Sequence, residues 1–293
     1  MFKLFAILLS LSLPAMAQPL SVVTDIGPIS GIVNAVGHDQ VSVTQLIDDQ
    51  QSAHHITLRP SQARALGSAD LIVLTGPALL QGLYEKIPTF APETPIIVLQ
   101  SIEGTVLFGT DEHDHDDHDH ADADADAVDP HMWLLPENAI TWAREIASNL
   151  AKLNAANAHV FTQNAADFET HIVALARNAP VFSPSDTIGL SHNAYQYLLH
   201  HLGDPRTIVV TDAKATSPSA KDIAEVQTAV SKTPPLCFVI DPNEPSALAH
   251  QIAAAAGVDT ITLSPLVGND MGHNNAYLDL LATVLRGFQD CAS

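Results

Sequence analysis

Residues 187–201 read TIGLSHNAYQYLLHH, an apolar run followed by a polar turn and then a segment without glycine or proline. This pattern predicts a strand over 187–190 and a helix over 193–201. The same unit recurs downstream, where strands are expected at 207–210, 236–240 and 260–263 and helices at 217–230, 246–256 and 278–288. Strands that alternate with helices through short turns predict a parallel sheet.

The first half of the chain has the same rhythm. Strands are expected at 22–26, 41–47, 71–74 and 96–99, and helices at 28–36, 61–66 and 78–86, with Ser61 as the N-cap after Pro60. The sequence therefore predicts an α/β fold with two similar lobes, each a parallel sheet flanked by helices.

Glycine and proline are absent from residues 137–179, which predicts helices near 137–152 and 156–178. Phe161, Ala165, Phe168, Ile172 and Leu175 recur at spacings of four and three, which marks one apolar helix face. We expect a long, rigid backbone helix over 155–179 to join an N-terminal lobe, 18–154, to a C-terminal lobe, 180–293.

The amino-acid composition excludes some classes of function. The 293 residues include 12 Lys plus Arg, 33 Asp plus Glu and 15 His, for a net charge of −21. A chain this acidic is not expected to bind nucleic acid through its overall field. The 46% of hydrophobic residues supports a real core and excludes wholesale disorder.

The first residues have the features of a secretory signal peptide. Lys3 precedes a short apolar run over 4–13, and Ala15-Met16-Ala17 forms an Ala-x-Ala cleavage site. We expect removal of 1–17, and because Gln18 follows rather than cysteine, we expect no N-terminal lipid. No later run is long and apolar enough to span a bilayer. The mature protein is expected to be exported, soluble and monomeric.

Cys237 and Cys291 are the only cysteines. In an oxidising compartment two cysteines most simply form one disulfide, and two buried thiols are the alternative. The bond would close a loop of about 55 residues and contribute ~4 kcal/mol in the chain-entropy model.

One segment, 111–126, is of low complexity. It holds nine acidic residues and four histidines, His113, His115, His118 and His120. Such a composition cannot bury a core and predicts a mobile surface loop. Because four imidazoles within eight residues suit borderline metals such as Zn²⁺, we assign these histidines as auxiliary metal ligands.

Three other histidines lie in distinctive motifs: His54 in 52–61 (SAHHITLRPS), His131 in 129–134 (DPHMWL) and His192 in 191–195 (SHNAY). Each is expected at or beyond a strand end or in an ordered loop, where open α/β sheets bind ligands. Two come from the first lobe and one from the second, so they can converge in an interlobe cleft. Neutral imidazole is the usual nitrogen ligand of Zn²⁺. The remaining histidines are expected to be ordinary polar residues, with His55 ambiguous.

These motifs, taken in order with the His/Asp loop, resemble the cluster A-I substrate-binding proteins of ABC metal importers, and among them the periplasmic zinc-binding, ZnuA-type members. The likeness covers essentially the whole mature chain. It implies two α/β lobes bridged by a rigid helix, a metal in the cleft, and His54, His131 and His192 as its ligands. It also implies that Cys237 pairs with Cys291.

The departures from the family pattern favour zinc. Manganese-binding members usually have a carboxylate where this chain has His192, and an Asp where it reads Ser264-Pro265-Leu266. Some zinc members have Glu where Ala53 stands. The pattern therefore predicts three histidines with a water as fourth ligand; Asp270 or His273 is the alternative.

The resemblance implies a non-enzymatic, periplasmic zinc-capture component that delivers Zn²⁺ to an ABC permease and its ATPase. Capture is expected to weaken as pH falls through the histidine range, and release to use small motions. A manganese-binding relative, a zinc hydrolase, and a zinc buffer or adhesin are the alternatives. Against the hydrolase, the chain has no His-Glu-x-x-His pair, and no unassigned carboxylate is recognised in a motif beside the ligands.

Overall fold

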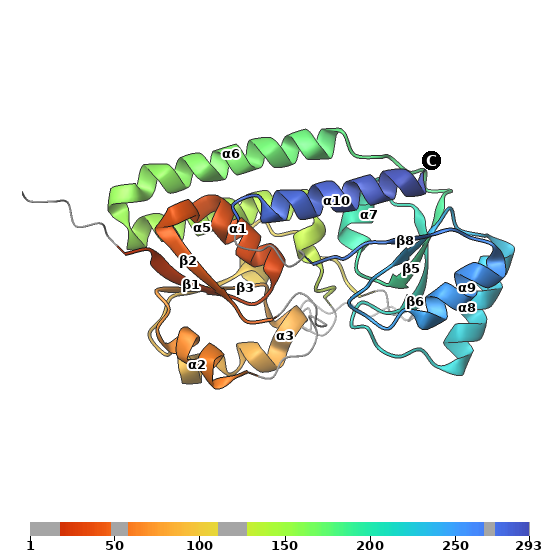
Figure 1. The fold of residues 1–293 in the computed structure, drawn as a ribbon, viewed down its shortest axis with the longest axis horizontal. Coiled ribbons are helices and arrows are strands. Elements are labelled where there is room, and N and C mark those ends of the chain that lie inside the picture. The colour runs from red at the N-terminus through yellow and green to blue at the C-terminus, as the bar shows by residue number, and fades with distance from the viewer. Residues whose placement is uncertain (1–17, 48–57, 111–127, 267–272, 293) are drawn as a thin grey trace, which may run out of the picture.

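The computed structural model describes residues 18–47, 58–110, 128–266 and 273–292 and contains two four-stranded parallel sheets (Figure 1). The first has the order β2-β1-β3-β4 and the second the order β6-β5-β7-β8, so the same arrangement occurs twice. The strands are β1 Leu20–Thr24, β2 Val41–Gln45, β3 Leu71–Leu74, β4 Ile96–Val98, β5 Thr187–His192, β6 Arg206–Thr211, β7 Phe238–Ile240 and β8 Thr260–Thr262. The two α/β lobes expected from the sequence are thus confirmed.

Helices flank both sheets, largely where their periodicity predicts them. They are α1 Gly27–Gly37, α2 Pro60–Gly67, α3 Pro77–Tyr84, α4 Ile87–Phe90, α5 Pro136–Leu153, α6 Ala158–Arg177, α7 Gln196–His201, α8 Ala220–Lys232, α9 Ala247–Ala256 and α10 Ala276–Cys291. Short 3-10 turns are η1 His38–Gln40, η2 Leu99–Ser101, η4 Met132–Leu134 and η5 Ala155–Asn157.

One local expectation was wrong, and one helix ends earlier than expected. The expected helix 78–86 corresponds to α3, which ends at Tyr84, and a separate short helix, α4, begins at Ile87. Pro88 has no amide hydrogen and suits the first turn of this second helix. Ser61 is not the N-cap of α2: Pro60 takes the first helical position, and Arg59 is the cap residue. The Arg59 amide donates to the side-chain oxygen of Gln62 at 2.7 Å.

The helix α6 runs along α5 and packs against α1 (Figure 1). Phe161, Ala165, Phe168 and Ile172 are buried and Leu175 is partly buried, so the predicted apolar face is confirmed. A separate turn, η5, precedes this helix, which therefore begins at Ala158.

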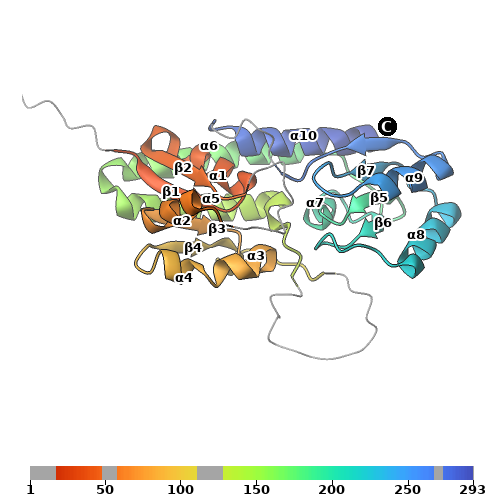
Figure 2. The ribbon, with the colours of Figure 1, turned by 60° about the horizontal axis from the view of Figure 1, so that its bottom comes forward.

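The last helix also bridges the two sheets, which the sequence did not reveal. α10 packs against α1 beside the first sheet and against β8 in the second, as both views show (Figures 1 and 2). A Cβ on Gly31 of α1 would lie 2.8 Å from the backbone nitrogen of Tyr277, so the two helices are in close contact. One apolar core consequently extends from the first sheet through α1, α5, α6 and α10 to the second.

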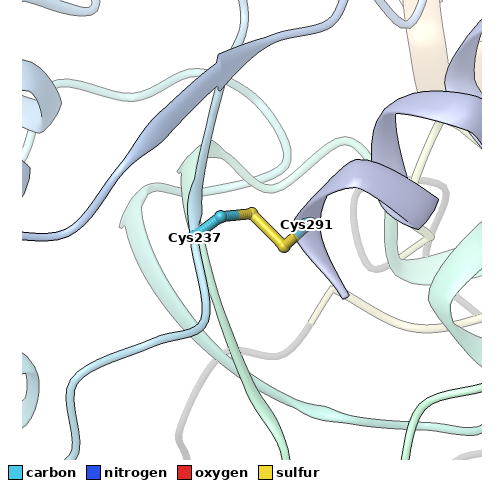
Figure 3. The surroundings of a disulfide bond; sticks show 2 residues. All are labelled: Cys237 and Cys291. Atoms are coloured by element: carbon cyan, nitrogen blue, oxygen red, sulfur yellow. A yellow bond between two sulfur atoms is a disulfide. The ribbon is translucent and has the colours of Figure 1, made fainter. Parts of the chain in front are cut away.

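Cys237 and Cys291 form the expected disulfide, with their Cα atoms 5.4 Å apart (Figure 3). The bond joins the residue before β7 to the end of α10 and so fixes the far end of this bridging helix to the second sheet. Among the described residues, none of the helices combines the length and apolarity that a membrane crossing requires.

Candidate metal centre

His131 is fixed by the aspartate two residues before it. The backbone N–H of His131 donates to Asp129 Oδ1 at 2.8 Å, and the ring Nδ1 lies 2.9 Å from the same oxygen. Both side chains are almost fully buried, with exposures of 1% and 0%. The turn η4 follows at once, and its Met132 carbonyl accepts a hydrogen bond from Asn138 at the start of α5. His131 therefore lies just before a long helix, in a turn that hydrogen bonds with Asp129 and Asn138 stabilise.

His192 is the last residue of β5 and is 2% exposed. Its Nδ1 lies 3.0 Å from Asp241 Oδ2, and its Nε2 lies 3.4 Å from the carbonyl oxygen of Ala213. Asp241 directly follows β7, which pairs with β5, so parallel pairing brings the two side chains together at one sheet edge. The Asp241 amide also donates to Ser191 Oγ at 2.8 Å.

The two imidazoles meet although their residues are far apart in the sequence. Their ring centroids are 4.9 Å apart, and the ring planes are inclined by 74°. In each ring Nδ1 faces a buried carboxylate, an arrangement that fixes the ring's orientation and leaves Nε2 as the coordinating atom in metalloproteins. The pair thus has the chemistry of half a tetrahedral zinc site.

The charge states of this buried group depend on its partners. Burial and the neighbouring His192 charge lower the pKa of His131 well below its usual range, so this imidazole is neutral, the form that binds metals. Burial also acts to lower the pKa of His192, but the hydrogen bond and charge of Asp241 outweigh it and raise that pKa. Burial raises the pKa of Asp129 to about 7.

The other predicted ligands cannot be placed beside this pair. His54, Asp270 and the loop histidines His113, His115, His118 and His120 lie outside the described residues. Within the described parts of the chain, no group of three or more His, Cys, Asp or Glu side chains is suited to a metal ion. The three-histidine site therefore stays a prediction.

His273 lies beside residues 267–272, and its side chain is 42% exposed. Its Nε2 lies 3.7 Å from Asp279 Oδ2, and its Nδ1 accepts a hydrogen bond from the Asn275 amide. Ser264 donates from Oγ to Asn243 Oδ1 at 2.7 Å. Both residues have ordinary polar partners.

Sequence reasoning missed the two carboxylates. The motifs gave neither aspartate a role, whereas the structure pairs Asp129 with His131 and Asp241 with His192. Asp129 stands two residues before His131, a spacing that lets an aspartate accept from a nearby backbone amide. Asp241 follows a strand of the same sheet that ends at His192. The first signal lies within a single motif. The second can be recognised only when the order of the strands in the sheet is known.

Known proteins resemble this chain over nearly its full length. The family model described as ZnuA, zinc-uptake complex component A, periplasmic, matches residues 22–291. The high-affinity zinc uptake system protein ZnuA of Paracoccus denitrificans is 29% identical, over 96% of this chain and 94% of that protein. The protein of the same name from Yersinia pestis is 26% identical, over 92% and 91%.

A solved structure supports the fold. The crystal structure of a ZnuA superposes with a TM-score of 0.78 at 20% identity, covering 94% of this chain and 100% of that one. Together with the family match over residues 22–291, the paired lobes and the buried histidines place this protein: it belongs to the family of the periplasmic zinc-uptake component ZnuA.

Proposed function

We propose that this protein captures Zn²⁺ in the periplasm and delivers it to the permease of an ABC importer, whose ATPase drives uptake. Membership of the ZnuA family supports this proposal, as do relatives named as high-affinity zinc uptake proteins. The role is one of binding and delivery and involves no reaction. In this proposal the mature chain begins at Gln18 and acts as a soluble monomer.

We place Zn²⁺ between His54, His131 and His192, with a water as fourth ligand. The observation that supports this best is the approach of the buried rings of His131 and His192 to a centroid distance of 4.9 Å, each with a carboxylate behind it. Imidazole nitrogens suit Zn²⁺ better than Mn²⁺, which prefers oxygen ligands. The proposed lobes are 18–154 and 180–293, joined by 155–179.

The histidines of 111–126 have a separate role in the proposal. His113, His115, His118 and His120 collect Zn²⁺ weakly, while the surrounding carboxylates raise the local cation concentration. The ion then passes to the buried histidines. This arrangement would help when zinc is scarce.

Calorimetric titration of metal-stripped mature protein tests both parts of the proposal. Zn²⁺ and Mn²⁺ are titrated into the intact chain, into a form lacking 111–126, and into His131→Ala. His250→Ala is the matched control, because His250 lies on the exposed side of α9. We expect one tight Zn²⁺ site that survives the loop deletion and His250→Ala but is weakened at least about a hundredfold in His131→Ala.

Two results would contradict the proposal. If only weak sites exist and they vanish with the loop, the buried histidines do not capture metal. If Mn²⁺ binds as tightly as Zn²⁺, the assignment of zinc as cargo is wrong. For the loop, an unchanged capture rate and unchanged transport at scarce zinc after its deletion would exclude the collecting role.

A further inference from the structure

The two chain segments that lead into and out of residues 111–127 are joined at their base. Gly109 and Val128 form an isolated antiparallel bridge, and the Asp129 amide donates to the Phe108 carbonyl oxygen at 2.9 Å. We call residues 108–109 together with 128–129 the stem. Because the stem ends at Asp129, which holds the ring and the amide of His131, any shift of the stem moves this histidine.

The helix α7 of the second lobe holds the stem through Tyr197. The Tyr197 hydroxyl donates to the Asp129 carbonyl oxygen at 3.0 Å and accepts from the Phe108 amide at 2.9 Å, so it links both strands of the stem. The rings of Phe108 and Tyr197 also pack together, with centroids 4.7 Å apart. Burial raises the pKa of Tyr197, which keeps the hydroxyl protonated and able to donate.

The neighbouring residue makes a second connection. With its amide oriented to satisfy both acceptors, the Gln196 nitrogen donates to Asp129 Oδ2 at 2.8 Å and to the Gly109 carbonyl oxygen at 3.2 Å. Asp129 is then held on one oxygen by Gln196 and on the other by His131. A chain of hydrogen bonds therefore runs from α7 through Asp129 to the imidazole.

We propose that Tyr197 and Gln196 are positioning residues for the metal site: from the second lobe they fix the stem, and through Asp129 they set the place of His131 before metal arrives. This inference rests on the proposed function, since it concerns how the same site is preorganised. The geometry supports it because His192, the ligand candidate from the second lobe, precedes these two residues on one continuous segment. The second lobe thus supplies one imidazole through His192 and, through Tyr197 and Gln196, holds the stem that carries the other.

Removing the Tyr197 hydroxyl should loosen the site. In Tyr197→Phe the Phe108 amide and the Asp129 carbonyl lose their common partner, and this part of the stem is buried or partly buried. A misplaced ligand binds metal less well, and partners behind metal ligands typically change affinity 10–100-fold. We expect Tyr197→Phe to weaken Zn²⁺ binding about tenfold, chiefly through faster dissociation.

A control variant separates positioning from general stability. Tyr195 is equally buried, and its hydroxyl donates to the Leu263 carbonyl oxygen at 2.8 Å, a bond within the second lobe. Tyr195→Phe therefore removes a comparable buried hydrogen bond without touching the stem. Both variants should lower the unfolding midpoint, but only Tyr197→Phe should change the metal site.

The readouts are Zn²⁺ affinity by chelator competition, the Zn²⁺ dissociation rate, and the visible spectrum of the Co²⁺-loaded full mature chain. Tyr197→Phe should alter the ligand-field bands of Co²⁺, whereas Tyr195→Phe should leave them as in the unmodified protein. Gln196→Ala, which keeps the Tyr197 bonds, should change affinity and spectrum in the same direction and serves if Tyr197→Phe fails to fold.

Unchanged affinity, dissociation rate and Co²⁺ spectrum in Tyr197→Phe and Gln196→Ala would overturn the inference while Zn²⁺ capture by the unmodified protein still stood. Equal effects of Tyr195→Phe and Tyr197→Phe would also overturn it, because they would indicate a general loss of stability. Absence of tight Zn²⁺ binding in the unmodified protein would instead refute the proposed function.

Discussion

Removal of the Cys237–Cys291 bond should cost about 4 kcal/mol of unfolding free energy. The cysteines are 54 positions apart in the sequence, and the chain-entropy model gives ~4 kcal/mol for closing a loop of this size in the unfolded chain. The perturbation is the double variant Cys237→Ala, Cys291→Ala, which leaves no single reactive thiol. Both cysteines are buried, at 2% and 7% exposure, so the lost sulfur contacts add to the cost.

Equilibrium urea unfolding followed by tryptophan fluorescence measures this cost. Trp133 and Trp142 are both fully buried. Trp133 Nε1 donates to the Pro265 carbonyl oxygen at 2.8 Å, so this side chain connects η4 to the segment that follows β8. The variant should unfold at lower urea concentration and with a steeper dependence on urea, because the unfolded chain expands when the cross-link is lost. The unmodified protein under reducing conditions should behave like the variant.

The result that would refute this reasoning is a loss below about 1 kcal/mol with an unchanged dependence on urea. The bond would then constrain neither the unfolded chain nor α10. Two separate unfolding transitions in the oxidised protein would refute the continuity of the core, since one core that extends through both sheets should unfold as a unit.

Three further results are expected. His201 Nδ1 lies 3.3 Å from Glu137 Oε1; this hydrogen bond raises the pKa of His201 and lowers that of Glu137. Glu137→Gln should therefore destabilise the protein most between about pH 4.5 and 6.5, by less than about 1 kcal/mol because Glu137 is largely exposed. The effect should fade as pH rises through the raised pKa of His201. An effect that grows above about pH 8 would exclude this pair. Gly31→Ala should cost about 1–3 kcal/mol in urea unfolding because its Cβ meets the Tyr277 backbone, whereas Gly82→Ala, with open space, should stabilise by about 0.5–1 kcal/mol; equal effects would argue against the close contact. Zn²⁺ at a hundred times its Kd should raise the unfolding free energy by about 2.7 kcal/mol in a denaturation series, and no rise would mean that the folded chain does not bind it.

Most of the fold could be predicted from local sequence patterns. The strand over 71–74 was predictable because a continuous apolar run of that length suits a sheet covered on both faces. The apolar face of α6 was predictable because its spacing repeats within a single helix. Ser61 failed as a cap because Pro60 suits the first helical position better, a competition between neighbouring residues that a motif alone does not decide.

The rest depends on contacts between distant segments. α10 packs against α1 because two apolar helix faces meet in space. Neither segment contains a sequence pattern that identifies the other as its packing partner. For the site, the motifs singled out His131 and His192, but Asp241 supports His192 only because β7 lies beside β5. The link from Tyr197 to Asp129 is likewise invisible to spacing, because it joins two lobes.

The contact between α1 and α10 has a consequence for how the chain acquires its structure during synthesis. α1 lies early in the chain, yet part of the apolar surface that packs on it is supplied by residues 276–291. Until these residues have been synthesised, this part of α1 cannot be covered by α10. Contacts between such distant segments also form slowly, because a long loop must close first. The first lobe is therefore completed only after the last helix has been made, and a chain truncated before residue 276 should be more sensitive to proteolysis than the full chain.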